Sequence, residues 1–448
     1  MITGATGRVM FFYAAPAFAL ALPTIPVYLH LPALYAPEIG LAATGVLLLV
    51  ARLFDTITDP FVGLLSDRTR GILGRRKPWI AGGAMVAGLG LFYLLNPPDT
   101  PSASYLLANS ILLYGGWTMV AVPYLAWGAE LSADYNKRTE VVAWREGTGL
   151  IGIVTAGILI AAAVHLGFSE REAVGGLAWC AIAVGAVTIP VLLWAVPDPP
   201  ASVFCNRKKP ANTIKAMLAG LIRNRPFHRL LGAWFVNGLA NSIPAALFLM
   251  YLEHRMGATE TVRASLILLY FLSAIAAIPL WSALSRKQGK HRVWCWAMLS
   301  ACLAFVGVPL LGPGDFVLFA FVCVVTGMAL GADLALPPAI QADVVDYETM
   351  RTGDAKAGFQ FALWSMATKL ALALGVGVAL PLLGALGFDP SAPTPGGLQS
   401  LAVIYAFAPV VIKTFAIMIM WRFPLTAKKH EIIRQRLLRR AETRGGVV

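Results

Sequence analysis

Apolar runs long enough to cross a membrane recur along the whole of this 448-residue chain. A helix of about 20 apolar residues crosses the hydrocarbon of a bilayer and hydrogen-bonds its own backbone groups. Hydrophobic residues make up 58% of the chain and charged residues 13%, a balance that excludes a water-soluble domain of this length. We therefore expect an all-α membrane protein with twelve transmembrane helices. The expected spans are 9–36, 41–66, 78–96, 103–130, 147–167, 176–196, 229–252, 263–285, 292–312, 315–342, 358–387 and 398–421.

Basic residues are concentrated on one side of the expected membrane. Of the 36 Lys and Arg residues, 29 lie in alternate loops and the C-terminal tail, whereas the opposite loops hold Arg171, Arg255 and Arg263. Cytoplasmic loops carry such an excess of Lys and Arg. The bias predicts a multi-pass protein of the cytoplasmic (inner) membrane with both termini in the cytoplasm. It also accounts for the net charge of +13 without a nucleic-acid partner.

The chain divides into two halves at its longest expected cytoplasmic connection, the basic and proline-containing stretch 200–228. We expect an N-terminal six-helix half at 1–199, a C-terminal six-helix half at 229–421 and a basic cytoplasmic tail at 422–448. The tail predicts an amphipathic helix on the anionic inner leaflet, with partner binding as the alternative.

A weak internal repeat supports this division. Glu130 precedes Arg138 by eight positions after the span 103–130, and Asp343 precedes Arg351 by eight after the span 315–342. Parallel six-helix repeats are a recurring transporter design, with the substrate site between the halves near the bilayer midplane. The expected architecture is therefore two pseudo-symmetric six-helix bundles.

Two carboxylates, Asp55 and Asp59, lie four residues apart inside the span 41–66. This spacing places both on one helix face, and Pro60 removes a backbone donor next to them. A carboxylate in hydrocarbon costs several kcal/mol unless it is paired. Two such groups therefore require a hard cation, a proton or a basic partner. We expect a coupling-ion site for Na+, with Li+ or H+ as alternatives.

Two further residues bear on this site. Thr118, in the span 103–130, can add a hydroxyl oxygen. Arg52, three residues before Asp55, either forms a buried salt bridge that serves packing alone or competes with the cation as a coupling partner.

The span 41–66 runs into a motif that begins Gly63-x-x-x-Asp67-Arg68 and ends Arg75-Arg76-Lys77-Pro78-Trp79. Its basic residues predict a cytoplasmic loop, and Asp67 among them can also make a gate contact that breaks during transport. The two roles are compatible. The candidate gate residues are Asp67, Arg68, Arg75, Arg76, Glu130, Arg138, Asp343, Asp346 and Arg351.

This motif resembles the signature loop of the major facilitator superfamily, and the D-x-x-x-D-P before it resembles the glycoside, pentoside and hexuronide cation symporter family. Further matching stretches are 123–130 and 342–347, and the resemblance covers nearly the whole chain. It implies the major facilitator fold. It also implies a cation site at Asp55, Asp59 and Thr118, a nearby lysine at Lys369, and a sugar-recognising arginine at Arg145.

The expected cargo depends on where the chain departs from that family. Acidic residues in the first and fourth spans grip the sugar in the family pattern, whereas this chain has no acid before Glu38 and has Ala121 in the fourth span. A sugar or glycoside and an amphiphile such as a lysolipid both remain open. For Asn237 and Asn241, bonding between helices is an equal alternative, and Asp333 can form an ion pair with Lys369 or Lys413. The candidate pocket residues are Tyr124, Arg145, Asn237, Asn241, Asp333 and Trp364.

These features predict a cation-coupled secondary symporter of a small organic solute that works by alternating access. It is expected to act as a monomer in the bilayer, with no cofactor besides the coupling ion. An uncoupled facilitator or exporter is one alternative. An intramembrane prenyl transferase is another, because D-x-x-x-D can hold Mg²⁺ on a diphosphate and Asp343 with Asp346 offers a second acidic cluster. The twelve spans and the basic loop argue against an enzyme.

Overall fold

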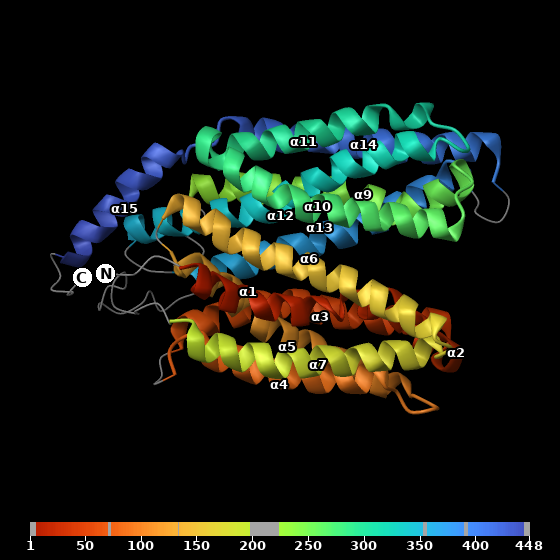
Figure 1. The fold of residues 1–448 in the computed structure, drawn as a ribbon, viewed down its shortest axis with the longest axis horizontal. Helices are drawn as coiled ribbons and strands as arrows, with labels where there is room; N and C mark the ends of the chain where they lie inside the picture. The colour runs from red at the N-terminus through yellow and green to blue at the C-terminus, as the bar shows by residue number, and fades with distance from the viewer. Residues whose placement is uncertain are drawn as a thin grey trace. The chain divides into compact units, whose positions relative to one another are not determined.

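The computed structural model describes residues 6–69, 73–132, 134–197, 224–352, 356–388 and 393–442, so most of the predicted linker 200–228 and the end of the tail lie outside the described residues. The described chain is almost entirely helical (Figure 1). Its first helices are α1 Gly7–Ala21, α2 Leu31–Ile39, α3 Leu41–Arg68, α4 Lys77–Leu95, α5 Ala103–Glu130, α6 Tyr135–His165 and α7 Glu170–Ala195. Later helices are α9 Arg225–Met250, α10 Glu260–Gln288, α11 Lys290–Val306, α12 Phe316–Thr352, α13 Ala357–Ala385, α14 Pro395–Trp421 and α15 Ala427–Glu442.

Short irregular turns join some of these helices. They are the π-helical turns η1 Pro26–His30 and η2 Tyr251–Arg255 and the 3-10 turn η3 Val308–Leu310. Turn η1 interrupts the single span predicted at 9–36, at a proline that lacks the backbone donor of a regular helix.

Eleven helical segments of the described chain are long and apolar enough to cross a membrane. Helix α3 is not among them, although it has 28 residues, and it carries Arg52, Asp55 and Asp59 within its length. The eleven segments together with α3 confirm the predicted all-α membrane fold. Several helices outrun the predicted apolar spans. For example, α6 starts at Tyr135 rather than 147, where Asp134 accepts hydrogen bonds from the backbone amides of Asn136 and Lys137.

The chain forms two compact units. The first unit comprises Met1–Lys208, Glu348–Met366 and Arg434–Val448, and the second unit comprises Lys209–Tyr347 and Ala367–Ile433. The start of α13 therefore packs with the N-terminal helices although it follows α12 in the sequence. The domain boundaries predicted above remain a prediction.

Small residues bring α4 and α5 of the first unit into close contact. A Cβ added at Gly116 would lie 2.3 Å from the backbone nitrogen of Ala87, and one at Gly90 would lie 2.5 Å from that of Leu113. Glycines at such crossings let two transmembrane backbones approach closely. Helix α5 also packs on α3, and this contact places Thr118 opposite the carboxylates of α3.

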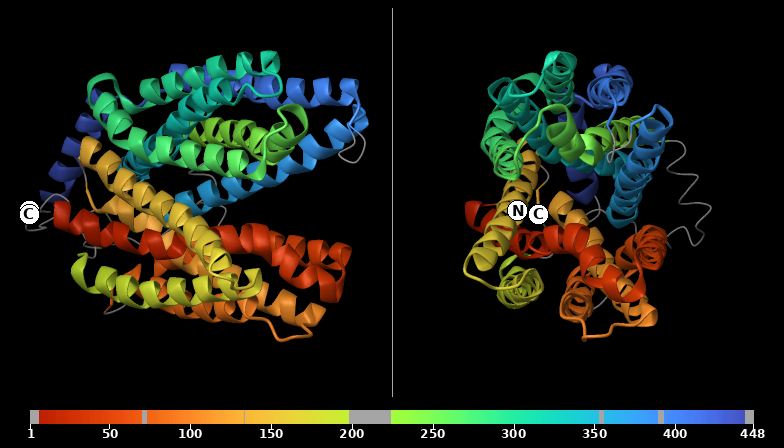
Figure 2. Two further views of the ribbon diagram at one scale, coloured as in Figure 1. Left: turned by 45° about the vertical axis from the view of Figure 1, so that its right-hand side comes forward. Right: turned by 90° about the vertical axis from the view of Figure 1, so that its right-hand side faces the viewer.

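In the second unit, α14 packs on α9 and α11. The ring of Tyr251, the first residue of η2, stacks on Tyr405 of α14 with centroids 4.5 Å apart. Figures 1 and 2 show α9, α11 and α14 in colours from green to blue.

Helix α15 is partly buried against the protein. Its His430, Ile433 and Leu437 are buried, while Ile432 is exposed. The ring of His430 lies against two carboxylates of α12, which compensate this polar group at the buried face. The contact of this helix with the inner leaflet remains a prediction.

Candidate functional site

One threonine hydroxyl lies between the two intramembrane carboxylates. The Oγ1 atom of Thr118 lies 2.6 Å from Oδ1 of Asp55 and 2.8 Å from Oδ1 of Asp59, within hydrogen-bond distance of both. All three side chains are buried. A hydroxyl has one proton, so Thr118 donates to one carboxylate at a time and its lone pairs remain available as ligands.

This arrangement suits a small hard cation or a shared proton. Two ionised carboxylates held on one hydroxyl repel each other in a low-dielectric site, and a cation or proton removes that repulsion. Oxygen ligands from carboxylates and hydroxyls are those that hard cations prefer. The residues therefore fit a transported cation, although their role as its ligands remains a prediction.

Arg52 does not occupy the buried position that a packing salt bridge with Asp55 would require. Its side chain is exposed, and the guanidinium carbon lies 4.3 Å from the centroid of the Tyr28 ring. The phenol of Tyr114 also lies near this guanidinium. Lys369 lies in α13 within the second unit, and its pairing with the cation site remains a prediction.

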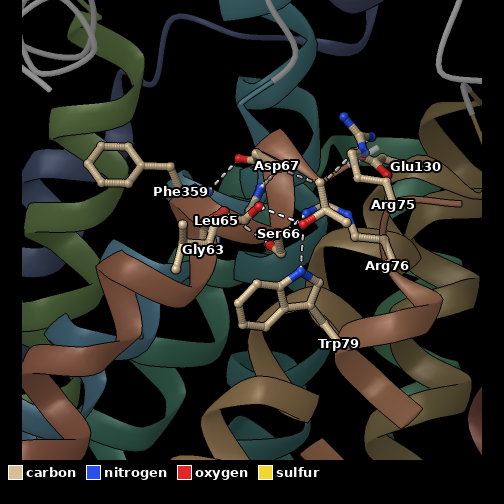
Figure 3. A network of polar contacts seen from close by, with 11 residues as sticks. Gly63, Leu65, Ser66, Asp67, Arg75, Arg76, Trp79, Glu130 and Phe359 are labelled. Atoms are coloured by element: carbon tan, nitrogen blue, oxygen red, sulfur yellow. Dashed lines mark hydrogen bonds and ion pairs between the residues drawn. The ribbon is translucent and has the colours of Figure 1, made fainter. Parts of the chain in front are cut away.

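The end of α3, the residues just before α4 and the end of α5 form a partly buried ionic cluster, here called the Asp67 cluster (Figure 3). Its members are Asp67, Arg75, Arg76 and Glu130. The fully buried Arg76 lies 2.7 Å from Oδ1 of Asp67 and 3.0 Å from Oε1 of Glu130. Arg75 lies 2.6 Å from the same oxygen of Glu130. Burial lowers the pKa of Arg76, but the charges of Glu130 and Asp67 outweigh burial and raise it. Arg76 therefore stays charged.

Asp67 also caps the start of α13. Its carboxylate accepts hydrogen bonds from the backbone N–H groups of Gly358 at 3.0 Å and of Phe359 at 2.9 Å (Figure 3). The first N–H groups of a helix lack partners within the helix, and its positive end favours an anion.

Glycines allow this approach of α13 to α3. A Cβ at Gly358 would lie 2.7 Å from atoms of Arg76, Asp67 and Gly63, and one at Gly63 would lie 2.6 Å from Cβ of Ala362. The predicted motif thus places its glycine and its aspartate against the same helix.

Three other candidate gate residues also lie in the first unit. Arg138 is buried and donates to the backbone oxygen of Ser132 at 2.7 Å, and Arg351 lies 3.2 Å from Glu348. Arg68 is exposed at the end of α3.

Asp343 and Asp346, on α12 in the second unit, bind partners that the sequence did not indicate. The ammonium group of Lys290 lies 2.7 Å from Asp343, and Nε2 of His430 lies 3.6 Å from Asp343 and 3.1 Å from Asp346. Both partners lie on other helices, more than fifty positions away, so no local spacing could have revealed them.

Two of the pocket candidates lie together in the first unit. Tyr124 and Tyr13 pack with ring centroids 4.7 Å apart, and each hydroxyl donates to the backbone oxygen of the other residue. The guanidinium of Arg145 lies near Tyr13 and forms an ion pair with Glu146. The sequence reasoning missed Tyr13 and Glu146. Glu146 had a signal, since it is an acid directly before the predicted span 147–167.

Three other candidates form a buried polar cluster in the second unit, here called the Asp333 cluster. Oδ2 of Asp333 accepts from Asn237 at 3.0 Å and from Asn241 at 2.8 Å. Oδ1 accepts from the indole of Trp294 at 2.6 Å. Lys413 donates to Asn237 at 2.5 Å and lies 3.8 Å from Asp333. The sequence left Lys369 and Lys413 as alternative ion-pair partners of Asp333, and the structure shows the pair with Lys413.

These contacts can serve bonding between helices as well as a pocket. Trp364, the remaining pocket candidate, is buried in α13 within the first unit. Membership of all six candidates in one substrate pocket remains a prediction.

A helical fold of this kind, with a carboxylate pair inside a span and an ionic cluster where two spans meet, defines a polytopic membrane transporter. The family model described as MFS/sugar transport protein matches residues 10–427, so the chain belongs to that family. The family and its structural neighbours are transporters, and the prenyl transferase alternative is thereby set aside.

Curated relatives and a solved structure agree with this assignment. The human sodium-dependent lysophosphatidylcholine symporter 1 is 22% identical, over 88% of this chain and 78% of the relative. An isoprimeverose transporter of Lactiplantibacillus pentosus is 23% identical, over 90% and 85%. The crystal structure of the major facilitator superfamily transporter FucP in the outward conformation superposes with a TM-score of 0.64 at 13% identity, covering 91% of this chain and 98% of that one. This structure supports the fold alone.

Proposed function

We propose that this protein is a cation-coupled symporter of a sugar or glycoside, with Na+ as the coupling ion. The observation that carries the proposal is the meeting of Asp55 and Asp59 at the hydroxyl of Thr118. Packing alone does not account for three buried oxygen-bearing side chains at one point between two transmembrane helices. Apolar residues would fill the same space with a smaller desolvation cost.

The cation and the solute favour each other's binding in this proposal. A cation between Asp55 and Asp59 removes the repulsion that otherwise opposes their close packing. If the solute binds better to the form with a neutralised site, then by linkage the cation also binds better when solute is present. This reciprocal free energy couples the downhill movement of the ion to accumulation of the solute.

The family description and the isoprimeverose transporter support a sugar or glycoside as cargo. The lysophosphatidylcholine symporter supports Na+ as the ion and also supports an amphiphile as the alternative cargo. Fold alone does not choose between these solutes.

We further propose that the docking of α13 on Asp67 breaks and re-forms as access alternates. The contact joins two segments far apart in the sequence through two backbone hydrogen bonds and one carboxylate, so few bonds need to change. The protein is proposed to lie in the cytoplasmic membrane as a monomer, with both termini in the cytoplasm.

The test begins with a search for cargo by thermal unfolding of the purified full-length protein. Sugars, glycosides and lysolipids are added one at a time, with Na+ or with choline as the cation. A ligand of the native state raises the unfolding temperature. We expect a sugar or glycoside to do so more strongly in Na+. Stabilisation by lysolipids and by no glycoside would contradict the proposed cargo.

Coupling is then measured as uptake of that cargo into proteoliposomes with and without an inward Na+ gradient. We expect Asp55→Asn and Asp59→Asn to abolish gradient-driven accumulation while the protein remains inserted and monodisperse. Asp99→Asn is the matched control, because this carboxylate is fully exposed outside the spans. Equal uptake with and without an Na+, Li+ or H+ gradient would show an uncoupled facilitator and overturn the proposal.

A further inference from the structure

Arg145 and Glu146 are adjacent residues of α6 and form an ion pair within the first unit. Their side chains are 7% and 24% exposed. At 1.5 Å per residue, Arg145 lies roughly 15 Å along α6 from its first residue, just before the apolar stretch predicted at 147–167. A buried arginine needs a compensating charge, which Glu146 supplies. The pair as a whole carries no net charge.

A ligand could open this pair more readily than most buried ion pairs. Neighbouring residues of a helix project about 100° apart and do not face each other, so both long side chains must bend to meet. Glu146 is the more exposed partner. The pairing therefore depends on side-chain conformation rather than on helix geometry.

Tyr13 is a second neighbour of Arg145 and is held by the fold. Its side chain is fully buried, and its hydroxyl is held by the reciprocal bonds with Tyr124. Gly128 makes room for this hydroxyl, since a Cβ there would lie 2.1 Å from it. Arg145 thus has one neighbour held by the fold and one ion-pair partner that can exchange.

We propose that Glu146 selects the charge of the transported solute and favours neutral glycosides over hexuronides. The inference rests on the proposed function and deepens it. The pair offers guanidinium donors and carboxylate acceptors without net charge, which matches the hydroxyl groups of a neutral sugar. The carboxylate of a hexuronide must instead displace Glu146 or lie beside it, and like charges at contact are unfavourable.

The test compares two probes that differ at one carbon, 4-nitrophenyl β-D-glucoside and 4-nitrophenyl β-D-glucuronide. Their affinities are measured by calorimetry on purified full-length wild type, Glu146→Gln and Glu140→Gln. Glu140 is a matched control, because it lies on α6 one and a half turns before Glu146. The galactoside and galacturonide pair is run in parallel.

We expect the wild type and Glu140→Gln to prefer the neutral probe of each pair. In Glu146→Gln the ratio of hexuronide to neutral affinity should rise at least about tenfold, because Arg145 is then uncompensated. An unchanged ratio, a parallel loss of both affinities in Glu146→Gln, or a wild type that prefers hexuronides overturns the inference while leaving the proposed function standing. If folded wild type binds no glycoside of either kind, the proposed sugar function fails and the inference fails with it.

Discussion

The carboxylate of Asp67, at the end of α3, accepts a hydrogen bond of 2.9 Å from the backbone N–H of Phe359, at the start of α13. The same carboxylate is paired with a fully buried arginine, so one side chain satisfies a helix terminus and a buried cation together.

Removing the charge and removing the cap at Asp67 should have separable effects. Asp67→Asn keeps an acceptor for the N–H of Phe359 but loses the ion pair with Arg76, whereas Asp67→Ala loses both. We expect the asparagine variant to lower the free energy of unfolding by about 1–3 kcal/mol and the alanine variant to lower it further. Thermal unfolding in detergent measures this order. Equal losses would show that capping of α13 contributes nothing.

Close packing at Gly358 should make alanine costly there. The added Cβ would lie 2.7 Å from the Arg76 guanidinium and the Asp67 carboxylate, and overpacking of this kind costs about 1–3 kcal/mol. Gly377→Ala on the same helix is the control, because a Cβ there would have no described atom within 4 Å apart from its own stretch of helix. Alanine there should be neutral or mildly stabilising. Equal unfolding temperatures of the two variants would contradict this prediction.

The hydroxyl of Thr118 should contribute to cation affinity. Thr118→Val keeps the shape but removes the oxygen between Asp55 and Asp59, and we expect roughly tenfold weaker Na+ binding. Thr118→Ser restores the hydroxyl and should bind almost as the wild type does. The readout is the Na+ concentration that gives half of the maximal thermal stabilisation. Wild-type affinity in the valine variant would remove Thr118 from the ion site.

Charge balance in the Asp333 cluster should appear in a double-mutant comparison. Asp333→Asn leaves Lys413 buried without its carboxylate, and breaking a buried pair in this way costs about 3–5 kcal/mol. Lys413→Met in addition should restore much of that stability. If the double variant is stable but has lost glycoside binding, the cluster belongs to the substrate pocket.

His430 should hold α15 on the second unit. His430→Ala removes the contacts with Asp343 and Asp346, and we expect faster hydrogen exchange along α15 with little change elsewhere. Ile432→Ala on the same helix is the control, since its side chain is exposed. Unchanged exchange in the histidine variant would mean that the apolar residues alone dock the helix.

The sequence by itself determined the fold class and located the intramembrane carboxylates. Both are local properties, because hydrophobic length decides whether a segment spans the membrane and a spacing of four residues places Asp55 and Asp59 on one helix face. The same reasoning found the motif that begins at Gly63 and includes Asp67. Of the two alternatives for Arg52 it could not choose, since charge and spacing do not reveal that the guanidinium lies over the ring of Tyr28.

The tertiary structure alone decided which side chains meet. Asp67 and Phe359 are 292 positions apart, and Tyr13 and Tyr124 are 111 positions apart. No periodicity encodes such pairs, because they depend on which faces of two helices pack together and at what height. Even the ion pair of Arg145 with its neighbour required the structure, since adjacent residues of a helix point in different directions until packing bends them together.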